Sequence, residues 1–104
     1  MNAKEELLNY VSGISSKLLC ATITHDKESD YQPTFNLLLG YTPEDLENFL
    51  NSLDFDYNNG YGLQTLFGTV WFSDGIWLER GEYDGSEWWQ HCKYPDIPEK
   101  LILF

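Results

Sequence analysis

Two Asp-Gly pairs constrain the fold of this chain of 104 residues more than any other feature. They are Asp74-Gly75 and Asp84-Gly85, and both lie within the stretch FGTVWFSDGIWLERGEYDGSEWW, between segments with strand character. An Asp-Gly pair between two strands is typical of a two-residue type I′ hairpin, because both central residues then take positive φ angles. The sequence therefore predicts an antiparallel meander of three strands over residues 63–73, 76–83 and 86–93.

Counting outward from two-residue turns assigns every residue of this meander to one of two sheet faces. Val70 then lies opposite Glu79, and Gly68 lies opposite Gly81, with Trp88 expected to fill the gap over the two glycines. The face assigned to the core carries Leu66, Gly68, Val70, Phe72, Trp77, Gly81, Tyr83, Trp88 and Cys92, with Glu79 and Gln90 as polar exceptions. The opposite face carries Phe67, Thr69, Trp71, Leu78, Arg80, Glu82, Glu87, Trp89, His91 and Lys93.

The rest of the chain predicts two helices and two further strands. Asn2 and Glu5 have the spacing of a capping box ahead of apolar residues at helical spacing. In TPEDLENFLNSL, Thr42 can cap a second helix, whose first residue is Pro43. Residues 17–24 and 34–39 have strand character. We predict a single α+β domain over residues 1–104, in which an N-terminal hairpin and the C-terminal meander form an antiparallel sheet of about five strands, with both helices on one face.

Charge is the most unusual property of the composition. The chain has 6 basic and 17 acidic residues, a net charge of −11, and the interval from Glu28 to Glu79 contains no Lys or Arg. Such a field repels nucleic acid and anionic membranes and attracts basic protein surfaces. The alternative explanation is solubility alone.

Other general features favour a reduced, cytoplasmic setting. The opening MNAKEELLNY lacks the pattern of a secretory signal, and no apolar run approaches the roughly 20 residues of a membrane helix. Cys20 and Cys92 do not have the spacing of a zinc site or of a disulfide framework. We therefore expect reduced thiols and no membrane association.

Candidate chemistry is weak throughout the chain. Asp54, Asp56 and Asn58 take the first three ligand positions of a calcium loop, but Thr65 stands where that loop needs a glutamate, so we predict a solvated turn. Paired carboxylates beside the second hairpin, with a nearby histidine, are the candidates for an enzyme site, which would need a pocket that raises one pKa. The common enzyme motifs are absent, so we predict no catalytic residue, no metal and no cofactor.

Three segments resemble small acidic proteins encoded by tailed bacteriophages. They are YTPEDLENFLNSLDFDYNNGYG, GTVWFSDGIWLERGEYDGSEWW and YPDIPEKL, and the likeness covers residues 40–104. The resemblance implies a phage origin and hence the host cytoplasm, and it carries no activity and no functional residues. Small acidic phage proteins often occupy basic surfaces of host proteins, as anti-CRISPR, anti-restriction and uracil-glycosylase inhibitor proteins do.

Together these features favour a non-enzymatic inhibitor that occupies the basic surface of a host nucleic-acid-handling or defence protein, by mimicry of nucleic acid. The residues expected to contact the partner are the acids Glu44, Asp45, Glu47, Asp54 and Asp56, and an exposed sheet group of Trp71, Arg80 and Trp89. One alternative is a homodimer or assembly protein that uses the same sheet face, and another is a small enzyme using Glu82, Glu87 or His91. If the apolar end LILF or the N-terminal hairpin covers that face, function would lie on the acidic helix and the following loop.

Overall fold

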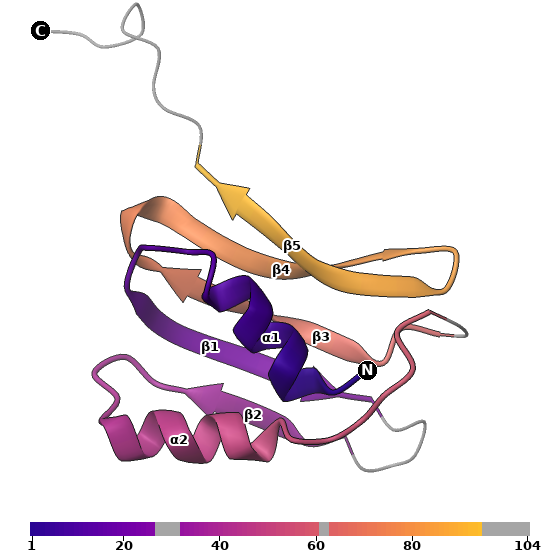
Figure 1. Cartoon of the computed structure of the whole chain (residues 1–104), viewed down its shortest axis with the longest axis horizontal. Helices are drawn as coiled ribbons and strands as arrows, with labels where there is room; N and C mark the ends of the chain where they lie inside the picture. Colours follow the sequence, from indigo (N-terminus) through magenta and orange to yellow (C-terminus); the bar gives the residue numbers. More distant parts are fainter. Residues whose placement is uncertain (27–31, 61–62, 95–104) are drawn as a thin grey trace, which may run out of the picture.

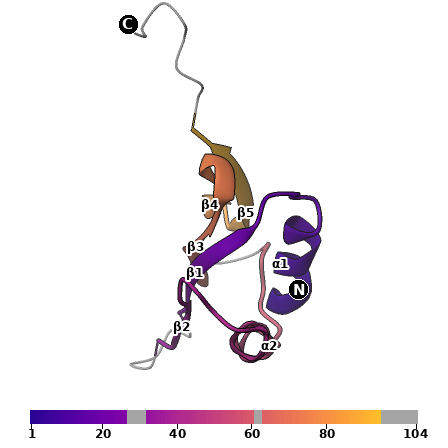
Figure 2. The same ribbon diagram turned by 90° about the vertical axis from the view of Figure 1, so that its left-hand side faces the viewer.

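The computed structural model describes residues 1–26, 32–60 and 63–94, which form a five-stranded antiparallel sheet and two helices (Figure 1). The elements in chain order are α1 (Ala3–Val11), β1 (Leu18–His25), β2 (Thr34–Leu37), α2 (Pro43–Ser52), β3 (Leu66–Phe72), β4 (Ile76–Tyr83) and β5 (Ser86–Lys93). The strand order is β2-β1-β3-β4-β5, and both helices lie on the same side of the sheet (Figure 2). The predicted α+β class, with an N-terminal hairpin and a C-terminal meander, is confirmed.

Both helices begin where their capping residues predicted. The Asn2 side chain accepts a hydrogen bond from the Glu5 N–H at 3.0 Å. At the start of α2 the capping box is complete, because Thr42 Oγ1 accepts from the Asp45 N–H at 3.1 Å and the Asp45 carboxylate accepts from the Thr42 N–H at 3.0 Å. These bonds satisfy N–H groups that have no partner within the helix.

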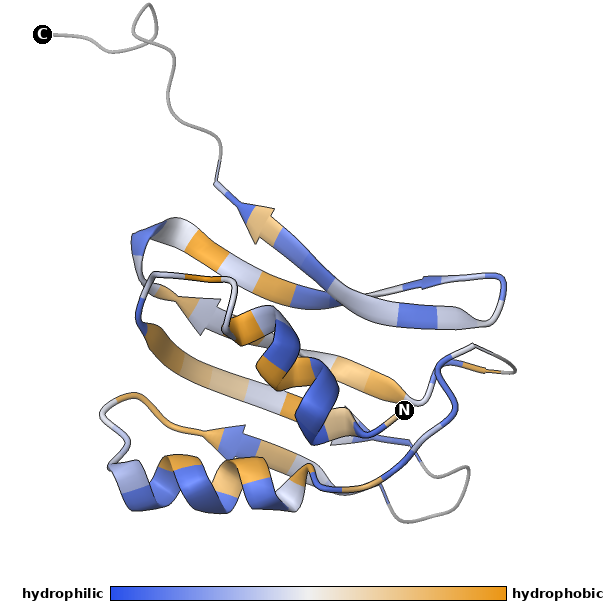
Figure 3. Cartoon of the chain, in the orientation of Figure 1, coloured by the Kyte–Doolittle hydropathy of each residue, from blue (hydrophilic) through white to orange (hydrophobic). Residues whose placement is uncertain are grey.

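The core lies between the two helices and the inner face of the sheet. Each helix alternates apolar and hydrophilic residues around its axis (Figure 3) and turns its apolar stripe toward the strands. The buried apolar residues are Ala3, Leu7, Ala21, Ile23, Leu37, Phe49, Leu53, Tyr57, Leu66, Val70, Phe72, Leu78 and Trp89. β1 and β3 supply the middle of this layer, so the two halves of the chain share one core.

The register of the meander differs from the prediction at its first turn. β4 and β5 pair as expected, with Gly81 opposite Trp88, around a two-residue turn in which Asp84 has φ 50° and Gly85 has φ 86°. Between β3 and β4, however, Val70 lies opposite Leu78, and the connection is the three-residue turn Ser73–Gly75. Because side chains alternate along a strand, this one-residue difference moves every side chain of β4 and β5 to the other face relative to β3.

The predicted faces of β4 and β5 are therefore wrong. The inner face carries Leu78, Glu87 and Trp89, which are buried, and the outer face carries Trp77, Gly81, Tyr83, Trp88 and Cys92. Trp88 does lie over Gly81, where a Cβ atom would be 2.7 Å from the indole ring. Gly68 has a different neighbour, since a Cβ atom there would be 2.3 Å from the Thr22 carbonyl oxygen, so Trp88 does not bridge the two glycines.

Candidate functional site

The corrected register places Arg80 in a buried cluster with side chains from three other parts of the chain. Its guanidinium lies 2.7 Å from Glu87 Oε1 and 3.3 Å from Glu6 Oε1, and the side chains of all three are at most 6% exposed. The Tyr57 hydroxyl donates to Glu6, and the guanidinium stacks 4.9 Å from the centroid of the Trp89 ring. The predicted contact between Arg80 and Trp89 thus exists, but inside the protein. Their predicted place on an exposed binding face is wrong.

Hydrogen bonds hold this cluster in its buried position. Glu87 also accepts from the main-chain N–H groups of Thr65 at 2.7 Å and Leu66 at 2.9 Å. Burial opposes the charge of Arg80, but Tyr57, Glu6 and Glu87 outweigh it and raise the arginine pKa above its ordinary value. Burial, and then the hydrogen bond to Glu6, raise the pKa of Tyr57. Arg80 therefore stays protonated and the Tyr57 hydroxyl keeps its proton at neutral pH.

The candidate enzyme residues have different surroundings. Glu82 and Glu87 lie opposite each other in register, as predicted. Glu87 forms the buried ion pair with Arg80, whereas Glu82 is exposed and accepts a hydrogen bond from the Gly85 N–H at 3.2 Å. His91 is exposed on β5. Among residues 1–26, 32–60 and 63–94, no cluster of three His, Cys, Asp or Glu side chains is arranged to hold a metal ion.

The acidic residues predicted to meet a partner lie on α2 and on the segment that follows it. All five are exposed: Glu44, Asp45, Glu47, Asp54 and Asp56. Asp45 caps its own helix, and Asp54 accepts from the Asn2 side-chain amide at 2.9 Å. None of the five forms an ion pair with another residue in the described part of the chain. Their charges are therefore directed to solvent rather than neutralised within the fold.

The outer face of the sheet carries an aromatic row. Cys20, Trp71, Trp77 and Cys92 are aligned across four strands, with Trp71 directly opposite Trp77. Both helices pack on the other side of the sheet (Figure 2), and the side chains of Trp71 and Phe67 remain 41% and 43% exposed. The N-terminal hairpin does not cover this face, since β1 and β2 belong to the same sheet. The predicted cover by residues 101–104 falls outside the described residues.

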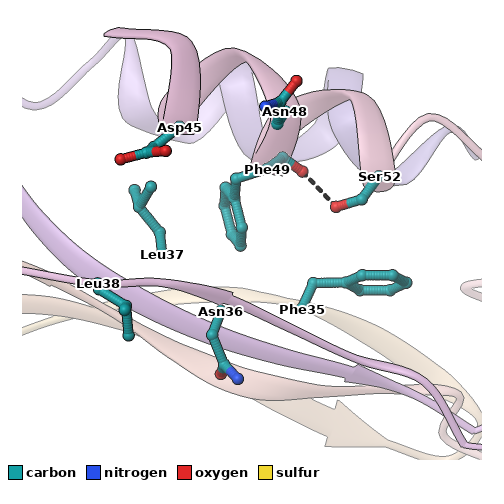
Figure 4. A pocket seen from close by; sticks show the side chains of 8 residues that line it. All are labelled: Phe35, Asn36, Leu37, Leu38, Asp45, Asn48, Phe49 and Ser52. Carbon is teal, nitrogen blue, oxygen red and sulfur yellow. Dashed lines mark hydrogen bonds between the residues drawn. The ribbon is translucent and has the colours of Figure 1, made fainter. Parts of the chain in front are cut away.

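A pocket of about 390 Å³ opens between α2 and the edge strand β2 (Figure 4). Four residues of α2 border it with the i, i+3, i+4, i+7 spacing of one helix face: Asp45, Asn48, Phe49 and Ser52. The strand side is Phe35, Asn36, Leu37 and Leu38. Sequence reasoning missed this pocket, because only Phe49 among the four helix residues is apolar. The signal that could have revealed the pocket is the polar residues beside Phe49 on one face of a helix that follows a short strand.

No family model, curated protein or solved structure matches this chain. No helix within the described residues has the length and apolar character needed to cross a membrane. The candidate site is therefore defined by its geometry alone: an exposed acidic helix, a pocket beside it at the sheet edge, and an aromatic sheet face that no helix or strand of the described residues covers.

Proposed function

We propose that this protein is a non-enzymatic inhibitor that binds the basic surface of a host nucleic-acid-handling or defence protein. The observation that carries the proposal is the set of exposed carboxylates on α2 and the segment after it, none of which is ion-paired within the described residues. The only arginine, Arg80, is buried with two carboxylates and does not neutralise this surface. The resemblance to phage proteins favours a host protein as the partner.

The spacing of the charges on α2 suits a partner that binds nucleic acid. A helix rises about 1.5 Å per residue, so Glu44 and Glu47 are separated by about 4.5 Å along the axis. Phosphates of one DNA strand follow each other at about 3.4 Å along the helix axis. Because carboxylates presented in a row attract the same Lys and Arg side chains as phosphates do, α2 would compete for a nucleic-acid groove and speed the encounter.

Charge reversal on α2 tests this proposal. The full chain is immobilised and exposed to a bacterial lysate at low salt, and retained proteins are identified by mass spectrometry. We expect a basic partner to be retained by the wild type and lost with Glu44→Lys/Glu47→Lys. The matched control, Glu5→Lys/Glu79→Lys, reverses two exposed carboxylates elsewhere and should retain it. Equal retention by both double variants, or no retained partner, would refute the proposal.

A homodimer is the second candidate, and it is favoured by the outer sheet face, which no helix or strand of the described residues covers. Large exposed apolar patches on a protein surface mark interaction sites, and Trp71 and Phe67 contribute such a patch. Two copies with a charge of −11 repel each other, so added salt should strengthen self-association, whereas it should weaken binding to a basic partner. Sedimentation equilibrium at low and high salt separates the two functions. A monomer under both conditions would exclude the dimer.

A further inference from the structure

The outer edge of β2 presents main-chain groups that have no partner in the described structure. β2 is the first strand in the order β2-β1-β3-β4-β5, so only β1 pairs with it. The His25 N–H donates to the Pro33 carbonyl at 3.0 Å, which marks this pair as a hydrogen-bonded one. Since such pairs alternate along an antiparallel ladder, the N–H and C=O groups of Thr34 and Asn36 point away from β1. These four groups can pair with one additional strand.

The pocket between β2 and α2 lies at this same edge. In Figure 4 Leu37, Phe49 and Asp45 converge between helix and strand, while the Asn36 side chain points away from α2. The main chain of Asn36 therefore borders the pocket. The floor is apolar, from Phe35, Leu37 and Phe49, and the helix wall is polar. A volume of about 390 Å³ has room for one or two large side chains.

The helix and the strand match in length. α2 has 10 residues and β2 has 4, which correspond to about 15 Å and about 14 Å. The two elements lie side by side over part of their lengths (Figure 1), so a strand added to β2 would run beside α2. Alternate side chains of that strand would enter the pocket, because successive side chains of a strand point to opposite faces.

The negative charges around the pocket favour an added strand that carries positive charge. Asp45 borders the pocket, and Glu44, the residue before it, is exposed on α2. At the opposite edge of the sheet, the Glu87 N–H of β5 already donates to the Asn59 carbonyl at 2.7 Å, and Lys93 adds a positive charge there. The β2 edge is therefore the better site for a positively charged segment.

We infer that an extended segment of the partner protein, with Lys or Arg two residues before and after an apolar residue, binds as a sixth strand along β2. Its main chain pairs with Thr34 and Asn36, its apolar side chain fills the pocket, and its basic residues meet the acids of α2. The basic character of the segment rests on the function proposed above, whereas the strand pairing rests on the edge and the pocket. The two parts can therefore fail separately.

The test uses a phage-displayed library of random 12-residue peptides, panned on the full chain at low salt. We expect enriched peptides in which Lys or Arg stands two residues from an apolar residue, because those side chains share one face of the added strand. Asn36→Pro removes one outward N–H without removing a bond to β1, since proline is tolerated at such edge positions. It should weaken peptide binding about tenfold, because a buried peptide carbonyl loses its donor, while Asn36→Ala should stay within about twofold. Fluorescence anisotropy measures both affinities.

Four outcomes would overturn the inference. They are the absence of enriched peptides, enrichment of peptides without Lys or Arg, equal binding by Asn36→Pro and wild type, and slow hydrogen exchange at Thr34 and Asn36 in the free chain. The last result would mean that a second copy or another segment of this chain already pairs with the edge, and its dependence on protein concentration would identify which. If Asn36→Pro does not fold, Asn48→Trp fills the pocket from the exposed helix wall and should abolish binding. Unchanged binding by that variant would be a fifth outcome that overturns the inference.

Loss of lysate binding by Glu44→Lys/Glu47→Lys, together with full binding by Asn36→Pro, would keep the proposed function and reject the strand pairing. The reverse pattern, with peptides that depend on Asn36 but not on the acids of α2, would reject the basic partner of the proposed function and the basic segment inferred here.

Discussion

Replacing Arg80 by methionine should severely destabilise the protein, because it removes the one positive charge from a cluster that holds two negative ones. Glu6 and Glu87 are 6% and 0% exposed in their side chains, and Arg80 is the ion-pair partner of both. Methionine fills a similar volume, so the change removes charge and hydrogen bonds rather than packing. Breaking a buried ion pair from one side costs about 3–5 kcal/mol, since the remaining charge is buried without compensation.

A loss of this size is large for a domain whose free energy of unfolding is expected at about 5–15 kcal/mol. The two contacts are unequal, however, because the guanidinium lies 2.7 Å from Glu87 and 3.3 Å from Glu6. Glu6→Gln should therefore cost only about 1 kcal/mol. It leaves a neutral Arg80–Glu87 pair, and the glutamine oxygen can still accept from Tyr57.

Urea unfolding followed by tryptophan fluorescence and by far-UV circular dichroism gives both free energies. Glu6→Gln is the matched control, because it changes one member of the same cluster by one charge. The reasoning would be refuted if Arg80→Met and Glu6→Gln cost the same, or if Arg80→Met cost less than about 1 kcal/mol. Either result would mean that the charges of this cluster are compensated in another way.

Three further predictions follow from particular contacts. Burial and Glu6 raise the Tyr57 pKa above its ordinary 10.0, so the protonated tyrosine stabilises the fold fully below about pH 10. Above that pH, the free energy of unfolding should fall by up to about 1.4 kcal/mol per pH unit. Urea unfolding at several pH values measures this slope, which should be flatter for Tyr57→Phe. Gly68→Ala should lower the free energy of unfolding in urea by several kcal/mol, because its Cβ atom would lie 2.3 Å from a main-chain carbonyl oxygen. Gly81→Ala should lower it by only about 1–3 kcal/mol, since the Trp88 ring can shift. Equal costs for the two variants would contradict this prediction. Burial raises the pKa of the Cys92 thiol, so iodoacetamide should alkylate it at pH 8 more slowly than a cysteine in an unstructured peptide, and an equal rate would contradict the shift.

Local signals were sufficient to predict the elements and the fold class. Thr42 and Pro43 marked the start of α2, and Asp84-Gly85 fixed the second hairpin together with its register. The pair Asp74-Gly75 was ambiguous, because Asp-Gly suits both a two-residue turn and a three-residue turn with residues at positive φ. The local sequence does not distinguish the two, and the difference reversed the faces of two strands.

The interactions that determine which face of β4 is buried come from residues far away in the chain. An inward-facing Arg80 is expensive unless it is paired, and its partners Glu6 and Tyr57 lie 74 and 23 residues away. A count along the meander alone therefore favoured the wrong face for Arg80 and Trp89. The pocket beside α2 was missed for a similar reason, since its strand side comes from β2, which local sequence does not place next to the helix.

The buried cluster around Arg80 also sets a time order for the chain during its synthesis. Glu6 belongs to the first helix, but Arg80 and Glu87 are made late, and Glu87 follows Glu6 by 81 residues. At about 5–20 residues per second, a ribosome needs roughly 4–16 s to add them. Until Arg80 is added, α1 lacks the positive charge that compensates its inward carboxylate, and β1 lacks its neighbour β3 until residue 72. The nascent chain therefore remains open to chaperones and proteases until the final hairpin emerges, and only then can the first helix dock.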